Sequence, residues 1–206
     1  MSASSAEPSP RAWQRMLSGR RLDLLAPDPA DIEIEDIAHG LARVARWNGQ
    51  THGAHAFSVA QHSVLVADIA AAQATEWPEN WRTAALLHDA PEYVIGDLIS
   101  PFKSAIGADY KSIERRLLRA IHLRFDLPEA LPTEIADAIK AADRIAAYFE
   151  ATALAGFDTE EARTFFGAHD GLPETVKSIC SDLTPLPPEA AQTQYLAAFK
   201  RASGWS

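Results

Sequence analysis

The sequence predicts an all-α protein, a bundle of six to eight helices in a single domain. Apolar residues recur at three- and four-residue spacing in several long segments, which is the pattern of an amphipathic helix. No segment alternates apolar and polar residues over enough positions to indicate a sheet, and a short hairpin near Arg20 is the only candidate. The 206 residues contain neither an internal repeat nor a shift in composition that would divide the chain.

Residues 1–19 are expected to form a disordered tail, because the first ten are mostly Ser, Ala and Pro and offer little to bury. Residues 20–206 are expected to form the helical domain. Within it, apolar periodicity and turn residues predict helices over about 33–46, 58–74, 78–89, 109–124, 132–154, 173–181 and 187–202.

The ends of the second and third predicted helices are the best defined. Ser58 suits the N-cap of the second, and Gln61 three residues later would complete a capping box. Two glycines and an Asn in the preceding stretch, 47–55, indicate a loop. Pro78 suits the first turn of the third helix, and Pro91 ends it, so that His88 and Asp89 lie at its C-terminal end.

Composition excludes several classes of partner and location. The formal net charge is −9 and no face rich in Lys and Arg stands out, which argues against binding to a nucleic acid polymer but permits a small anionic ligand. The single cysteine, Cys180, permits no intramolecular disulfide. The N-terminal segment has no apolar core of a signal peptide, and no apolar run is long enough to span a membrane. We therefore expect a cytoplasmic protein that binds no membrane.

Four polar residues stand in strongly apolar helical surroundings: His62, the adjacent pair His88 and Asp89, and Asp143. Each alone has an ordinary explanation, such as a core histidine or an ion pair. However, an Asp at a helix C-terminus opposes the helix dipole. Burying several ionisable groups together is also costly unless they share a partner.

One divalent cation is that partner, since two imidazoles and two carboxylates suit a borderline-to-hard ion. The residue types do not distinguish Co, Mn, Zn, Ni, Fe or Mg. Glu92 and Asp97 follow the His-Asp pair within nine residues and add acidic groups next to the predicted site.

The pattern H…HD…D formed by these four residues resembles the signature of the HD-domain phosphohydrolase superfamily. SVAQHS (58–63), LLHDAPEYVIGDLISPFK (86–103), YKSIE (110–114) and AADRIAAY (141–148) are similar to the bacterial 5′-deoxynucleotidase branch. The stretch 32–51 also resembles phage HD enzymes that remove triphosphate from deoxynucleoside triphosphates. The resemblance spans about residues 22–150 and implies that the helical bundle is an HD domain.

The resemblance also implies a role for each matching residue. The metal ligands would be His62, His88, Asp89 and Asp143. Glu92 would orient the attacking water, and Asp97 would assist proton transfer. Arg46 would hold phosphate and Trp47 would pack against the sugar, where a bulky ring disfavours ribonucleotides. Lys103 would be a second phosphate contact.

The sequence departs from the family at two places. Ile99 and Ser100 stand where the deoxynucleotidases have a Pro-Thr pair, and His52 and His55 have no sure counterpart. We expect these two histidines to face solvent in a loop, with substrate phosphate as the alternative. His122 and His169 are expected to be core or surface residues rather than ligands of a second metal.

The function implied most directly is release of phosphate from deoxynucleoside 5′-monophosphates by direct attack of a metal-bound water. One alternative is a deoxynucleoside triphosphate triphosphohydrolase, and another is an inactive HD module that only binds nucleotides. A homodimer is also implied. The region after residue 155 offers no functional interpretation.

Overall fold

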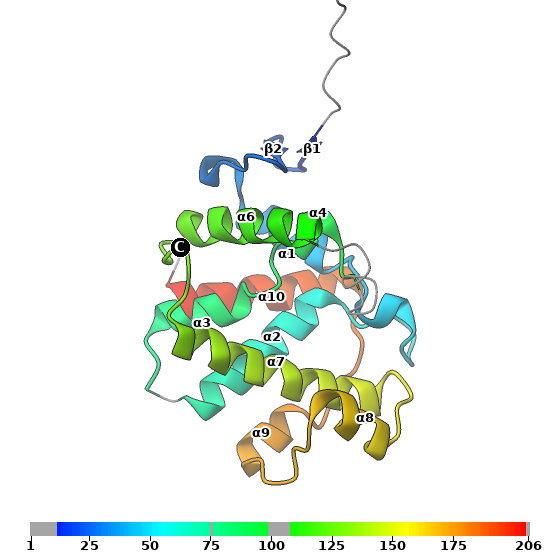
Figure 1. Ribbon diagram of the computed structural model, residues 1–206. Helices are drawn as coiled ribbons and strands as arrows, with labels where there is room; N and C mark the ends of the chain where they lie inside the picture. Colours follow the sequence, from blue (N-terminus) through cyan, green and yellow to red (C-terminus); the bar gives the residue numbers. More distant parts are fainter. Residues whose placement is uncertain (1–11, 75, 99–107, 205–206) are drawn as a thin grey trace, which may run out of the picture.

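The computed structural model describes residues 12–74, 76–98 and 108–204 and shows an all-α protein (Figure 1). The fold class predicted from the sequence is confirmed. Nine α-helices lie within these residues: α1 (Ile34–Leu41), α2 (Val59–Gln73), α3 (Glu79–Leu86), α4 (Glu92–Ile95), α6 (Ala108–Arg124), α7 (Thr133–Ala153), α8 (Thr159–Phe166), α9 (Glu174–Ile179) and α10 (Pro188–Ser203). Short 3-10 segments, η1 (Pro29–Asp31) and η2 (Arg46–Gly49), precede and follow α1.

Two of the nine helices, α4 and α8, were not predicted. Helix α4 has only four residues and follows directly on the turn at Pro91. Helix α8 is an eight-residue surface helix that buries Ala162 alone. Neither provides the repeated apolar spacing by which the longer helices are recognised.

Helix α2 is the central element of the bundle. All eight residues from Val59 to Val66 are buried, including His62. The helix packs against α3, α7, α9 and α10, and Figure 1 shows α3, α7 and α10 arranged around it. A helix that is apolar on every side must be surrounded by other helices, and for this reason a polar residue on α2 is enclosed by protein.

The predicted capping box at the start of α2 forms only in part. Ser58 Oγ accepts a hydrogen bond from the Gln61 backbone N–H at 3.2 Å, as expected of an N-cap. The Gln61 side chain does not return to Ser58 but donates to the Thr184 carbonyl and accepts from the Leu186 N–H, each at 3.0 Å. Gln61 thus fixes the segment before α10 against α2.

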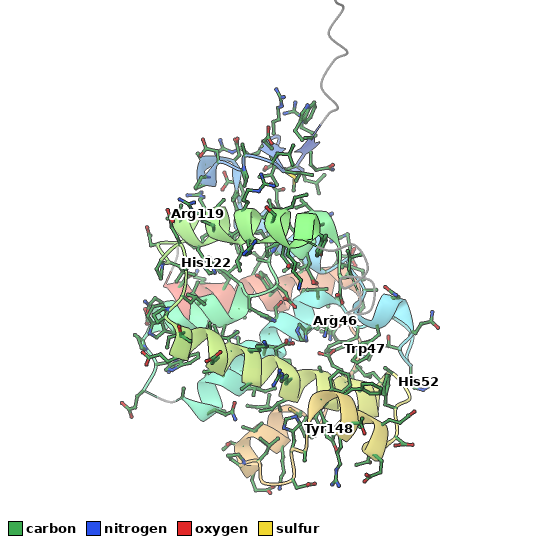
Figure 2. All side chains as sticks on the ribbon, viewed as in Figure 1. Arg46, Trp47, His52, Arg119, His122 and Tyr148 are labelled. Atoms are coloured by element: carbon green, nitrogen blue, oxygen red, sulfur yellow. The ribbon has the colours of Figure 1, made fainter. Side chains whose placement is uncertain are left out.

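Helix α1 ends at Leu41, earlier than the predicted residue 46, and the chain then turns sharply. Trp47 and Asn48 adopt φ values of 56° and 51°, in the left-handed region that residues other than Gly rarely occupy. The Arg46 N–H donates to the Phe57 carbonyl at 2.8 Å, which anchors the turn to the segment before α2. This turn directs Arg46 and Trp47 back toward the bundle (Figure 2).

The expected hairpin near Arg20 is confirmed. Strands β1 (Trp13–Arg15) and β2 (Arg21–Asp23) pair antiparallel, and the completely buried Leu22 fixes the hairpin to the bundle. The prediction of disorder over residues 1–19 is therefore wrong for residues 12–19, since the alternation that forms this hairpin is only three residues long on each strand. No helix in the described part of the chain is both long and apolar enough to cross a membrane.

Candidate metal centre

The four predicted ligands lie together, although they come from three different parts of the chain. His62 projects from α2, His88 and Asp89 follow the end of α3, and Asp143 lies in the middle of α7. His62 Nε2 is 3.2 Å from Asp143 Oδ1 and 3.4 Å from Asp89 Oδ2. The same Asp89 oxygen is 3.2 Å from His88 Nε2. Two imidazole nitrogens and two carboxylates thus converge on one point.

The end of α3 determines how neighbouring residues can share this point. The helix ends at Leu86, and the Ala90 and Glu92 N–H groups then bond to the carbonyls three residues before them, in consecutive tight turns. Because the backbone leaves the helical path here, His88 and Asp89 both turn toward His62. The His88 Nδ1–H donates to the Ala85 carbonyl at 2.8 Å, so Nε2 carries the free lone pair of the neutral ring.

The donor atoms fit a divalent cation. His62 Nε2 and His88 Nε2 are both buried, and neither has a hydrogen-bond partner among the described residues. Ligand atoms of His62, His88 and Asp143 all lie within 4.8 Å of one another. Buried imidazole nitrogens without partners are costly. A divalent cation held by the two nitrogens and the neighbouring carboxylates would remove that cost.

A fifth residue, Glu150, belongs to the centre and was missed in the sequence. Its side chain is completely buried, and its Oε1 accepts a hydrogen bond from His62 Nδ1 at 2.5 Å. This bond places the proton on Nδ1 and leaves Nε2 free to face Asp89 and Asp143. Metal-binding histidines commonly donate their second N–H to a carboxylate in this way. The available signal was spacing, since Glu150 follows Asp143 by seven residues and so shares its face of α7.

Glu150 is held ionised by its neighbours. Its Oε2 accepts from Arg46 Nε at 3.2 Å and from Trp47 Nε1 at 2.9 Å. Burial alone would raise the pKa of Glu150, but the charge of Arg46 and the hydrogen bonds from His62 and Trp47 outweigh burial and lower this pKa to about 2. The centre therefore contains a permanently charged carboxylate behind His62.

Arg46 and Trp47 thus both bind Glu150, the residue that holds His62 in place. Arg46 Nη1 also donates to Asp97 Oδ2 at 3.0 Å, so one guanidinium links Asp97 to Glu150. The Trp47 ring packs against Phe157 and Phe166, with ring centroids 5.5 and 5.7 Å away. The contacts of Arg46 with phosphate, of Trp47 with sugar and of Asp97 in proton transfer stay predictions.

The other predicted residues lie in different surroundings. Glu92 is buried as the first residue of α4, and its N–H donates to the Asp89 carbonyl at 3.0 Å. His52 and His55 are exposed in the loop before α2, as expected, whereas His122 lies in the core. Lys103, like Ile99 and Ser100, lies outside the described residues.

A cavity of about 250 Å³ opens beside the ligands. His88 and Asp143 form part of its wall, and the remainder comes mainly from α6 and α7. A larger cavity of about 610 Å³ lies between the end of α2, the start of α3 and the start of α7, and none of the predicted site residues lines it. We therefore assign the smaller cavity to the candidate centre, because it alone of the two is lined by predicted metal ligands.

Comparison with known proteins agrees with this geometry. Residues 36–182 match the model of the family described as 5′-deoxynucleotidase YfbR-like. The chain belongs to this YfbR-like family. The matched segment contains all four ligands as well as Glu92 and Glu150. Membership identifies the protein as a hydrolase of the phosphohydrolase type and supports the 5′-deoxynucleotidase branch of the HD superfamily, whereas the resemblance to phage enzymes stays a prediction.

Two relatives of this YfbR-like protein cover most of its length. An uncharacterised protein from Rhodobacter capsulatus is 59% identical over 179 residues, which are 87% of this chain and 90% of the relative. The uncharacterised protein YfdR from Escherichia coli is 31% identical over 173 residues, 84% of this chain and 85% of the relative. Because both relatives are uncharacterised proteins, their similarity to this chain does not identify its substrate.

Proposed function

We propose that this protein hydrolyses the phosphate ester of deoxynucleoside 5′-monophosphates, with one divalent cation held by His62, His88, Asp89 and Asp143. The observation that carries the proposal is the pair of buried imidazole nitrogens that face two carboxylates beside an open cavity and that have no hydrogen-bond partner in the described part of the chain. The family match supports the nucleotide class of the substrate. When bound, the cation supplies positive charge against the phosphate and lowers the pKa of water.

The chain's own residues supply the remaining steps. Glu92, buried one turn after the His-Asp pair, would accept a proton from the attacking water or orient it. The Arg46 guanidinium uses Nε for Glu150 and Nη1 for Asp97. Its Nη2 would stabilise negative charge on the phosphate. Asp97 would hold that guanidinium in place. No nucleophilic side chain is required: water would attack the phosphorus, the bond from phosphorus to O5′ would break, and the proton taken from the water would pass to the departing 5′-oxygen, which leaves as the hydroxyl of the deoxynucleoside.

A substrate panel tests this proposal. The purified protein is incubated with each deoxynucleoside mono- and triphosphate in the presence of Mn, Co or Zn, and phosphate and triphosphate are measured separately. We expect phosphate release from the monophosphates. Triphosphate release from the triphosphates would instead support the triphosphohydrolase alternative. Nucleotide binding without turnover under every metal would show a module that only binds.

A further inference from the structure

The chain after α7 turns back toward the metal centre, in a region for which the sequence predicts no function. Glu150 lies in the last turn of α7, and its backbone carbonyl accepts a hydrogen bond from the Leu154 N–H at 2.9 Å. Gly156 then adopts a φ of 78°, and the Phe157 N–H returns to the Ala151 carbonyl at 3.0 Å. Phe157 therefore lies beside the same turn of α7 that contains Glu150.

Helix α8 brings a second phenylalanine to the same place. Asp158 caps this helix directly after Phe157, and the last residue of the helix is Phe166. The Trp47 ring contacts both side chains, with centroids 5.5 Å from Phe157 and 5.7 Å from Phe166 and ring planes tilted by 56° and 82°. Tilted and edge-to-face contacts of this kind are favourable for aromatic rings. We call Phe157 and Phe166 the aromatic pair.

The backbone conformation of Trp47 depends on its surroundings. Its φ of 56° lies in the left-handed region, where a bulky residue is an outlier, and such a conformation persists only when neighbouring groups hold it. The His52 N–H donates to the Leu154 carbonyl at 2.9 Å, which ties the turn to the end of α7. Figure 2 shows Trp47 and His52 on the side of the bundle where α8 lies. The bond from His52 holds the backbone, whereas the aromatic pair holds the ring.

The orientation of the Trp47 ring determines where its N–H points. Nε1 donates to Glu150 Oε2 at 2.9 Å, while Glu150 Oε1 accepts from His62 Nδ1 at 2.5 Å. Glu150 and His62 are both completely buried, so bulk water cannot replace a lost partner. If the ring turned away, Oε2 would lose one of its two donors within the described residues, Arg46 being the other. The carboxylate would then be free to rotate away from His62.

We propose that Phe157 and Phe166 are positioning residues of the metal centre, which hold the Trp47 ring so that its N–H fixes Glu150 behind His62. This role rests on the proposed function, because it takes His62 to be a metal ligand. The aromatic pair acts through Trp47 and Glu150, since a phenyl ring has no atom that ligates a cation. The region after residue 155 thereby contributes to the centre, and the same two rings would hold Trp47 in place for the sugar contact predicted for it.

Metal binding tests this role without any turnover. Metal-free wild type, Phe166→Ala and Phe165→Ala proteins are titrated with Zn or Mn in a calorimeter. We expect Phe166→Ala to raise the Kd by about threefold to tenfold, less than the roughly 10–100-fold effect of losing a direct carboxylate partner of a metal-binding histidine.

Phe165→Ala is the matched control, since it makes the same change at the preceding position of α8. Phe165 is 70% exposed and contacts the aromatic pair with centroids 6.3 and 6.4 Å away, but makes no ring contact with Trp47 among the described residues. We expect Phe165→Ala to bind metal as wild type does.

Two further readouts distinguish positioning from a general loss of packing. The Nδ1 proton of His62, bonded to a carboxylate, gives a downfield resonance in the proton NMR spectrum, which is assigned by its absence in His62→Ala. We expect Phe166→Ala to shift or broaden this resonance and Phe165→Ala to leave it unchanged. In a Glu150→Gln background, Phe166→Ala should cause no additional loss of metal affinity, because both residues act through one series of contacts. An additive loss in the double variant overturns the proposed role.

Conservative variants keep the role testable if Phe166→Ala does not fold. Phe166→Tyr keeps the ring and should bind metal as wild type does. Trp47→Phe leaves a ring between the aromatic pair but removes the N–H that Glu150 accepts, so it should raise the Kd and shift the His62 resonance. Wild-type affinity together with an unchanged resonance in folded Trp47→Phe protein overturns the proposed role.

Failure of the proposed function gives a different result. If wild type binds no cation, the proposed function is contradicted, and the His62 resonance of the metal-free protein still tests the aromatic pair. If wild type binds a cation and folded Phe166→Ala and Trp47→Phe proteins bind it equally well, only the positioning role is overturned.

Discussion

His62 Nδ1 donates a hydrogen bond to Glu150 Oε1 at 2.5 Å, and both side chains are completely buried. The bond fixes the tautomer and the orientation of the imidazole, so that Nε2 faces Asp89 and Asp143. Arg46 and Trp47 bind the other oxygen of Glu150, which extends this support to the turn after α1. The candidate metal centre thus includes residues that hold His62 in place as well as the four proposed ligands.

Removing the negative charge of Glu150 should weaken the binding of the metal. We expect Glu150→Gln to lower metal affinity by about 10–100-fold, the usual effect of losing a carboxylate partner of a metal-binding histidine. Calorimetric titration of the metal-free protein with Mn or Zn measures this change. Glu174→Gln makes the same chemical change at an exposed ion pair on α9 and should bind metal as wild type does. Equal affinity in Glu150→Gln and wild type would remove Glu150 from the centre.

The ligands themselves should be indispensable. Either His62→Ala or Asp89→Ala should abolish stoichiometric metal binding and phosphate release, because each leaves the cation with too few donors. Metal content after dialysis, measured by atomic emission, and phosphate release are read on the same sample. Treatment of wild type with a chelator should produce the same loss, and adding metal back should restore it. Full turnover by metal-free His62→Ala protein contradicts the assignment.

Replacing Glu92 should slow catalysis without removing the metal. We expect Glu92→Gln to retain the metal yet lose a factor of about 10²–10⁴ in kcat, the range attributed to a general base. The residue is buried and close in sequence to two ligands, so metal content and thermal stability are measured alongside the rate. An unchanged kcat in a metal-loaded variant would place the base elsewhere.

Arg46 should be required for stability as well as for any contact with phosphate. Its side chain is 14% exposed and links Asp97 to the fully buried Glu150. Arg46→Met leaves two carboxylates without their cation, which should cost about 3–5 kcal/mol of the free energy of unfolding. Urea denaturation measures this loss. Arg119→Met, which breaks an exposed pair with Glu129, should cost only about 0–1 kcal/mol.

The sequence was sufficient to predict four residues that the structure brings together, but not Glu150, which holds His62 in place. His62, Asp143 and the pair at Pro91 stand out because each interrupts an apolar helix or ends one, which is a local property. Glu150 contacts residues 88 to 104 positions away, and nothing nearby distinguishes it from an ordinary helical glutamate. Long-range contacts of this kind become visible only when α2, α7 and the turn after α1 are packed together.

The same limit applies to the cavity and to the turn at Trp47. His122 was expected to be a core or surface residue, and its place in the wall of the smaller cavity becomes visible only when α6 is placed against α7. The helix predicted over 33–46 ends at Leu41, and residues 44–46 instead pair with the segment before α2, through the Val44 carbonyl, the Ala45–Ser58 bridge and the bond from Arg46 to Phe57. Apolar periodicity continues through Val44 and does not reveal that change.

Cys180 should be inert in the folded protein. It is 4% exposed, and burial, with a smaller contribution from the charge of Glu150, raises the pKa of the thiol to about 12. A thiol reacts as the thiolate, which forms only as pH rises toward the pKa, so at pH 8 the group stays protonated and shielded. We expect negligible modification by iodoacetamide under native conditions and complete modification in urea. In a Cys180→Ala background, Ser181→Cys places the thiol at an exposed neighbouring position and should react quickly. Rapid native labelling of Cys180 would show that α9 opens readily and exposes the region behind Glu150.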